Sequence, residues 1–180
     1  MIAKLRGKVI EKGLTYIFLD VNGITFLLKI PLSTGREIKS EEVELFTHLE
    51  ITEKGPELYG FLTKEEKEFF EDLIGIAGVG GAIALKVLSS FSYDEFKEIV
   101  LENKVYELKA IKGIGEKTAL RIIADLTEKY KREVITDIER EAVKALCSMG
   151  VDRKKAREVI KKCKERKNLE NLIKEALRML

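Results

Sequence analysis

The feature of this sequence that most constrains its fold is an internal repeat with a spacing of 35 residues. The pattern Leu-x-x-Ile-x-Gly-apolar-Gly-x-x-x-Ala begins at Leu73 and begins again at Leu108. In each copy a short apolar helix is expected to end at a Gly-apolar-Gly turn, after which a second helix begins. The repeat therefore predicts two helix-hairpin-helix elements in the middle third of the chain.

The two turns are predicted to bind anions. Glycine lets a ligand approach the backbone closely, and the first turn of a helix carries amides without an intrahelical acceptor at its positive end. A nucleic-acid phosphate suits both properties, and backbone amides do not distinguish bases. We therefore expect sequence-independent contacts with the DNA backbone at Gly78, Val79, Gly80, Ala82, Gly113, Ile114, Gly115 and Lys117.

The two copies differ in ways that affect the expected binding. Val79 and Ile114, between the glycines, should point inward and fix each hairpin, while Lys117 can add an ion pair. The first copy has Gly81 and Ala82 where the second has Glu116 and Lys117, so we expect the first to bind more weakly. A lone Gly-x-Gly is often only a tight turn between packed helices. The duplication favours phosphate binding over that simpler interpretation.

The first 62 residues read as five short strands. Runs rich in β-branched and aromatic residues cover about 2–11, 14–20, 24–30, 43–51 and 57–61. Lys12-Gly13 and Asn22-Gly23 are expected to be tight hairpin turns. Five strands with a longer connection near 32–42 suggest a small closed barrel of the OB type, although other small barrels also fit.

Helical signals begin at Thr63. S/T-x-x-E capping boxes at Thr63/Glu66, Ser92/Glu95 and Thr136/Glu139 each precede an apolar helical stripe. Residues 131–136 carry no clear stripe and read as a linker, and Asp152 and Asn168 are expected to cap the last two helices. The predicted fold is α+β with three small domains: a barrel (1–62), a tandem helix-hairpin-helix domain (63–130) and a three-helix, UBA-like bundle (137–180) after the linker.

Composition restricts the remaining classes. Cys147 and Cys163 are not spaced as a metal pair, and reduced structural thiols in the cytoplasm are their simplest interpretation. The longest uncharged stretch has 13 residues, Leu73 to Leu85, whereas a membrane span needs roughly 20. The net charge is only +2, but residues 131–180 carry 15 Lys and Arg against 9 Asp and Glu. DNA binding would then depend on local geometry, and the basic tail should favour an acidic partner.

The whole chain resembles the RuvA family of bacterial Holliday junction branch-migration proteins. The resemblance rests on both hairpins, the opening Met1 to Gly7, Phe46-Thr47-His48 and Leu58-Tyr59-Gly60-Phe61. It implies an OB barrel, tandem hairpins and a mobile tail domain, assembled as a homotetramer, or an octamer on DNA, that holds a four-way junction open. It also implies a separate RuvB ATPase as partner, the RuvC resolvase as a further one, and a role in recombination and DNA repair.

The resemblance also assigns residues outside the hairpins. The family has an acidic pin, usually two carboxylates, on the turn before the last barrel strand, and the matching residues here are Glu53 and Lys54. One carboxylate is kept and the other is replaced by a cation, with Glu50 or Glu57 as neighbours that could compensate. The matching RuvB-docking positions are Leu146, Met149, Val151 and Leu177, each of which could instead belong to the bundle core.

Two other function classes compete with DNA scaffolding. A helix-hairpin-helix glycosylase or nuclease would need a Lys or Asp near the second hairpin, for which only Lys117 and Asp125 are candidates. A single-strand or RNA binder would need aromatic platforms on the barrel, such as Tyr16, Phe18 and Phe26. The phosphate loop of an ATPase is absent from the sequence. We expect a non-catalytic chain without cofactor, metal site or membrane anchor.

Overall fold

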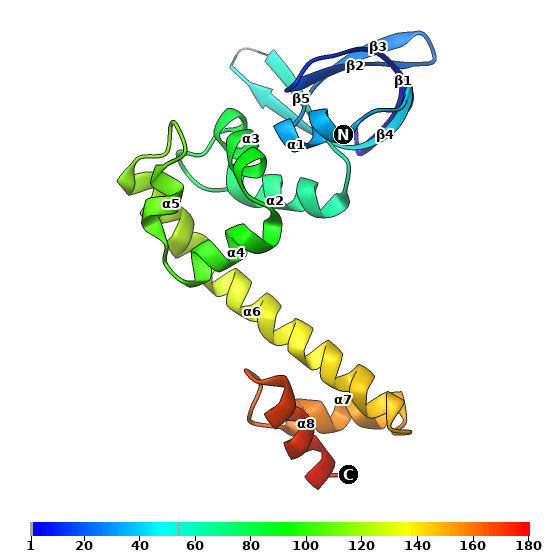
Figure 1. The fold of residues 1–180 in the computed structure, drawn as a ribbon, viewed down its shortest axis with the longest axis vertical. Coiled ribbons are helices and arrows are strands. Elements are labelled where there is room, and N and C mark those ends of the chain that lie inside the picture. The colour runs from blue at the N-terminus through cyan, green and yellow to red at the C-terminus, as the bar shows by residue number, and fades with distance from the viewer. Residues whose placement is uncertain (1, 54) are drawn as a thin grey trace. The chain divides into compact units, whose positions relative to one another are not determined.

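The computed structural model describes residues 2–53 and 55–180. Its contacts divide the chain into two compact units, residues 1–126 and 127–180, and each unit is described separately (Figure 1). The strands are β1 (Lys4–Lys12), β2 (Tyr16–Val21), β3 (Ile24–Lys29), β4 (Glu42–Thr52) and β5 (Gly55–Phe61). The helices are α1 (Leu32–Glu37), α2 (Lys64–Ile74), α3 (Gly81–Ser90), α4 (Tyr93–Leu101), α5 (Val105–Lys109), α6 (Glu116–Ser148), α7 (Arg153–Lys162) and α8 (Leu169–Arg178).

The five strands close into a barrel in the order β1-β2-β3-β5-β4, which confirms the predicted OB-type architecture. All neighbouring strands are antiparallel except β3 and β5, which pair in parallel through Lys29 and Tyr59. Ile17 and Leu19 alternate along β2 and are fully buried in the barrel interior with Leu28 and Leu45. Closure removes the exposed strand edges of so small a sheet.

Two connections of the barrel can be compared with their predictions. The turn at Asn22 and Gly23 has the predicted conformation, whereas the longer connection contains an additional helix. Asn22 and Gly23 both have positive φ, 53° and 88°, as a two-residue hairpin turn requires. The connection expected near 32–42 contains α1, a helix that was not predicted. A helix of six residues is too short to show an apolar stripe in the sequence. Within this helix, Gly35 packs against the backbone carbonyl of Leu14.

An aromatic cluster joins the barrel to the helices within the first unit. Tyr59 and Phe61 of β5 pack on Phe70 of α2, with ring centroids 4.6 and 5.0 Å apart. The next residue, Phe69, packs on Phe96 of α4 at 4.7 Å. The predicted capping boxes at Thr63/Glu66 and Ser92/Glu95 are present and begin α2 and α4. The barrel and the helix-hairpin-helix region therefore share a continuous buried contact.

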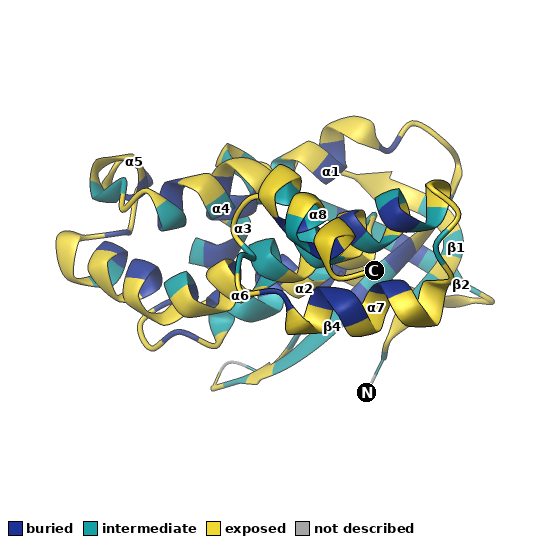
Figure 2. Ribbon diagram, turned by 90° about the horizontal axis from the view of Figure 1, so that it is seen from below, coloured by how far each residue is buried: buried dark blue, intermediate teal, exposed yellow. Residues whose placement is uncertain are grey.

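The second unit is a three-helix bundle formed by the C-terminal part of α6 with α7 and α8. Its core contains Ala142 and Leu146 from α6, Ala156 and Ile160 from α7, and Leu172 and Ala176 from α8. Figure 2 shows buried positions alternating with exposed ones along α7 and α8. Asp152 and Asn168 cap α7 and α8 as predicted, and Gly150, with φ of 90°, ends the turn after α6.

The expected linker at 131–136 is wrong as a statement about secondary structure, because these residues are helical within α6. Thr136 likewise caps no helix, since its hydroxyl donates to the Arg132 carbonyl at 2.9 Å inside α6. The segment contains neither Gly nor Pro, and pairs such as Lys129 with Glu133 stabilise an exposed helix. The absence of an apolar stripe in residues 131–136 therefore indicates a helix with little buried surface, and not a linker. The domain limits themselves stay a prediction.

None of the helices in the described part of the chain is long and apolar enough to cross a membrane.

Gly81, at the start of α3, lies against the hydroxyl of Tyr59, so that a Cβ at this position would overlap it. We predict that Gly81→Ala lowers the free energy of unfolding by about 1–3 kcal/mol, because the barrel and α3 must separate to admit the methyl group. Thermal and urea denaturation would measure this change. Gly80→Ser is the control, since its Cβ meets open space and serine suits an N-cap. Equal stability of the two variants would contradict this contact.

Candidate nucleic-acid interface

The two hairpins have the same backbone geometry 35 residues apart, as the repeat predicted. The first joins α2 to α3 and the second joins α5 to α6. Gly78 and Gly113 both adopt positive φ, 92° and 107°, a conformation that favours glycine. Three backbone hydrogen bonds of the first hairpin recur in the second. Ile76 N donates to Leu73 O at 3.1 Å and Val79 N to Ile76 O at 3.0 Å, and Ala84 N donates to Gly80 O at 3.0 Å. Their counterparts are Ile111 N to Leu108 O at 3.2 Å, Ile114 N to Ile111 O at 3.0 Å and Ala119 N to Gly115 O at 2.9 Å.

Val79 and Ile114 hold each hairpin together from inside. Each is only 4% exposed, and the amide of each already donates to a carbonyl of its own turn. The expectation that they point inward agrees with the structure, but their inclusion among the DNA-contacting residues needs correction. Neither the side chain nor the amide is available to a phosphate, so these residues position the hairpins.

The helix starts that follow the turns are accessible. Gly80, Ala82, Gly115 and Lys117 are exposed. Within the described residues, the amides at positions 81, 82, 116 and 117 have no acceptor, as expected for the first turn of a helix. These four amides lie at the positive end of α3 or α6, where an anion is favoured.

Gly80 and Gly115 are not required by the conformation of the chain. Neither has a positive φ, and a Cβ added to either would meet no atom within 4 Å. A larger residue would therefore fit the protein itself. What glycine provides at these two positions is unobstructed approach to the backbone from outside, which is the property that a phosphate site needs.

Two cationic side chains lock the hairpins to each other. Lys86 on α3 donates from Nζ to the carbonyl of Lys112 in the second hairpin at 2.9 Å. Arg121 on α6 donates from Nη1 to the carbonyl of Ala77 in the first hairpin at 3.0 Å. Both donors and both acceptors are 35 residues apart, so the two bonds are equivalent and reciprocal. The hairpins thus form one two-fold-like unit held by charge-assisted hydrogen bonds.

The pairing of Lys86 and Arg121 with the opposite hairpins was not predicted, although the sequence contains a signal for it. They occupy the same place in the two copies of the repeat, and both are cations. The spacing of Arg121 and Asp125, one helical turn apart, predicts an ion pair between these two residues. In the structure Arg121 reaches Ala77, and Asp125 forms no ion pair with any described residue.

The hairpins differ in what surrounds them. The first is held against the barrel, because Gly81 contacts Tyr59, whose hydroxyl donates to Glu57 at 2.6 Å. Burial, followed by the hydrogen bond to Glu57, raises the pKa of Tyr59, so the phenol stays protonated. The second hairpin has Lys117 in its first helical turn, and this ammonium pairs with no described residue. It therefore offers a cation in addition to its amides.

The predicted pin residue lies at the tip of the barrel. Glu53 is exposed in the turn between β4 and β5, where the Thr52 hydroxyl donates to the Gly55 carbonyl at 2.9 Å. Lys54, its predicted neighbour, is outside the described residues. Glu53 is therefore accessible in this turn, and its role as the pin stays a prediction.

The four predicted docking residues differ in how far they are buried. Met149 and Leu177 are 60% and 41% exposed, and Val151 is half-buried against the core. Leu146 is fully buried in the bundle core, so its assignment as a docking residue requires correction. A leucine at helical spacing fits either role, and only packing distinguishes them.

No metal-binding cluster accompanies the hairpins in the described ranges. No group of three or more His, Cys, Asp or Glu residues there could hold a metal ion. The single histidine, His48, is engaged with Glu71 of α2, with its Nδ1 2.9 Å from the carboxylate. It therefore helps to join the barrel to the helices.

The closed OB-type barrel, followed by a pair of hairpins bonded to each other, places this protein in the class of tandem helix-hairpin-helix proteins.

Residues 1–60 match the family model of the RuvA N-terminal domain, and residues 70–128 match that of the SAM-like helix-hairpin-helix tandem. A Holliday junction branch migration complex subunit RuvA from Christiangramia forsetii is 38% identical over the full length of both chains. Proteins of the same name from Flavobacterium psychrophilum (37%, full length of both) and Desulforamulus reducens (34%, 100% of this chain and 98% of the relative) agree. The chain belongs to the RuvA family.

The reciprocal bonds predict crossed effects on backbone exchange. Arg121→Met should speed amide hydrogen exchange at Val79, in the first hairpin, and Lys86→Met should speed it at Ile114, in the second. We expect changes of about three- to tenfold, which correspond to roughly 1 kcal/mol for an exposed charged hydrogen bond. Exchange followed by NMR on both variants would measure this. An increase confined to the mutated helix would show that the bonds do not hold the opposite hairpin.

Proposed function

We propose that this chain is a non-catalytic DNA-binding subunit that grips the backbones of a four-way junction without reading sequence. It would hold the junction open while a separate RuvB ATPase drives branch migration in recombination and DNA repair. One observation carries the proposal: two equivalent hairpins, bonded to each other, present accessible helix N-termini. At these N-termini stand Gly80 and Gly115, where neither the backbone conformation nor the packing requires a glycine. The names of the relatives support the choice of a Holliday junction as substrate.

Two hairpins in one rigid unit suit a DNA duplex because successive phosphates have a fixed spacing. Each helix start offers two amides, and Lys117 adds an ion pair in the second hairpin. Contacts of this kind fix the position of the protein on the backbone and carry no base information. The arrangement therefore supports recognition of the shape of a junction in preference to its sequence.

The substitution Gly115→Asp tests the proposed phosphate site. The side chain fits the open space around Gly115, so folding should be preserved, while the carboxylate repels phosphate. We expect affinity for a synthetic four-way junction to fall at least about tenfold, a loss of about 1.4 kcal/mol or more. Gel-shift titrations on junction and linear duplex would measure this, with thermal melting as the control for folding.

The equivalent substitution Gly80→Asp provides a matched comparison. It should weaken binding less than Gly115→Asp does, because the first hairpin lacks a counterpart of Lys117. Unchanged junction affinity in Gly115→Asp would mean that the second hairpin does not contact DNA. Equal affinity of the unmodified protein for junction and duplex would remove the junction from the proposal.

Glu53 is proposed to act as the acidic pin. Four copies near the centre of a tetramer would repel the phosphates of the crossing strands and help to keep them apart. Its exposed position at the tip of the β4–β5 hairpin supports this role. Glu50 is too far down β4 to share the tip, since it pairs with Glu57 three residues before the turn.

A homotetramer is proposed as the form that binds one junction, and an octamer would enclose it from both faces. An apolar groove of about 790 Å³ between β2, β3 and α3 supports self-association, because it includes Leu27, which is 50% exposed. Apolar surface of this kind on a globular unit favours burial against another subunit. The RuvC resolvase is proposed as a further partner of the assembled complex.

Docking of RuvB is proposed on the exposed apolar side chains of the second unit, Met149 and Leu177, together with the half-buried Val151. The double variant Met149→Asp, Leu177→Asp should abolish stimulation of RuvB-dependent branch migration and leave junction affinity unchanged. Strand-displacement and gel-shift assays measure the two properties separately. Asn171→Asp is the control, since it adds a carboxylate at an exposed position of α8 that is neither three nor four residues from Leu177. Full stimulation by the double variant would place RuvB docking elsewhere.

A further inference from the structure

The second unit contains a groove that the proposed function does not use. It lies between α6 and α7 and has a volume of about 770 Å³. Its floor is apolar and is formed by Val143, Cys147 and Ile160. Five cations border it, Arg140 and Lys144 from α6 and Arg153, Arg157 and Lys161 from α7. The exposed docking residues Met149 and Leu177 do not line it.

The cations form two rows along the groove. Arg140 and Lys144 are one helical turn apart on α6, and Arg153, Arg157 and Lys161 follow one another at the same spacing on α7. All five side chains are exposed. Like charges at this spacing repel each other and destabilise a helix. The two rows of cations therefore lower the stability of α6 and α7 unless an acidic ligand lies between them.

The protein neutralises little of this charge. Lys144, Arg153, Arg157 and Lys161 form no ion pair with any residue that the structure describes, and only Arg140 pairs, with Asp137 at 3.1 Å. Six of the ten residues of α7 are Lys or Arg. The groove thus has a surplus of positive charge over an apolar floor.

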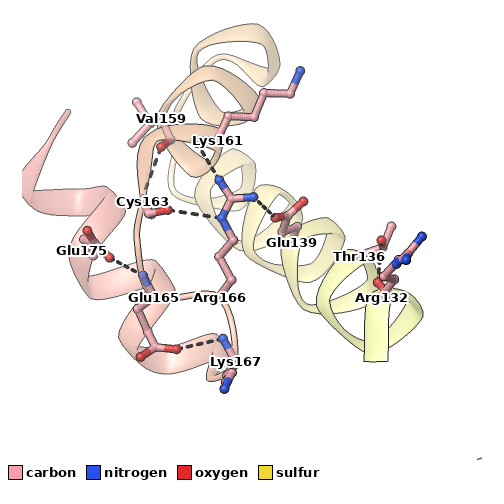
Figure 3. A network of polar contacts seen from close by, with 10 residues as sticks. All are labelled: Arg132, Thr136, Glu139, Val159, Lys161, Cys163, Glu165, Arg166, Lys167 and Glu175. Atoms are coloured by element: carbon pink, nitrogen blue, oxygen red, sulfur yellow. Dashed lines mark hydrogen bonds and ion pairs between the residues drawn. The ribbon is translucent and has the colours of Figure 1, made fainter. Parts of the chain in front are cut away.

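The single carboxylate that lines the groove is already engaged. Glu139 binds the Nη1 atom of Arg166 at 3.1 Å, and Arg166 also donates to the carbonyls of Cys163 and Lys161, which Figure 3 shows as one network. The ammonium of Lys161 points away from this network (Figure 3). The one carboxylate among the lining residues is therefore held by Arg166, which lies outside the two rows.

We propose that this groove binds an acidic amphipathic helix of a partner protein. An apolar stripe on such a helix would cover Val143, Cys147 and Ile160, and carboxylates on either side would pair with the two rows of cations. A nucleic acid fits less well, because phosphates could use the cations but would leave the apolar floor uncovered. The surface is separate from the apolar docking residues and does not depend on which protein occupies those.

The test uses the full chain and a synthetic peptide of roughly 14 residues, long enough to lie along the rows. The peptide carries a leucine stripe flanked by glutamates, and a control peptide carries glutamines in their place. Fluorescence anisotropy measures binding. Protection of Cys147 from a maleimide, read by mass spectrometry, reports occupation of the groove, because Cys163 is only 2% exposed and burial raises the pKa of its thiol.

We expect the acidic peptide to bind and to protect Cys147, and Arg157→Glu to weaken this binding about tenfold. Lys162→Glu makes the same change of charge on the same helix outside the groove, and should alter affinity less than twofold. Both variants should bind a four-way junction as the unmodified protein does, which keeps this test separate from that of the hairpins.

Three results would overturn the proposal. The first is equal binding of the acidic and glutamine peptides, and the second is an unchanged affinity in Arg157→Glu. The third is protection of Cys147 by a DNA oligonucleotide of matching charge, which would make the groove a phosphate site.

Discussion

The reciprocal pair of hydrogen bonds between the hairpins is the interaction on which the DNA-binding surface depends. A single helix start is a weak anion site, since it offers only a few amides at one end of a dipole. Lys86 and Arg121 each stabilise the turn of the opposite copy, so neither hairpin can move without disturbing the other. Two weak sites are thereby held at one fixed separation, which is what binding to a regular phosphate backbone requires.

The barrel supports this surface through one close contact and one aromatic cluster. Gly81 begins α3 against Tyr59, and Phe70 packs on the same ring, so the first hairpin is fixed relative to β5. The tip that carries Glu53 belongs to the β4–β5 hairpin of the same barrel. The elements proposed to hold the arms of a junction and to separate its strands are therefore parts of one packed unit.

Much of this could be predicted from sequence, because the signals were local. The Gly-apolar-Gly repeat, the Asn22-Gly23 turn and the caps at Thr63 and Asp152 each specify a backbone conformation within a few residues. What failed depended on packing or on long-range contact. Leu146 has the spacing of a surface or a core residue equally, and residues 131–136 lacked a stripe because their helix is exposed. The partners of Lys86 and Arg121 lie 26 and 44 residues away.

The central claim is that the two locked helix starts contact phosphates together, and amide chemical shifts test it most directly. In an NMR titration of the full chain with a synthetic four-way junction, the amides at positions 81, 82, 116 and 117 should shift and gain protection from exchange at the same DNA concentration. The buried amides of Val79 and Ile114, already bonded within their turns, should change least. Saturation of the junction without any change at these four amides would contradict the account.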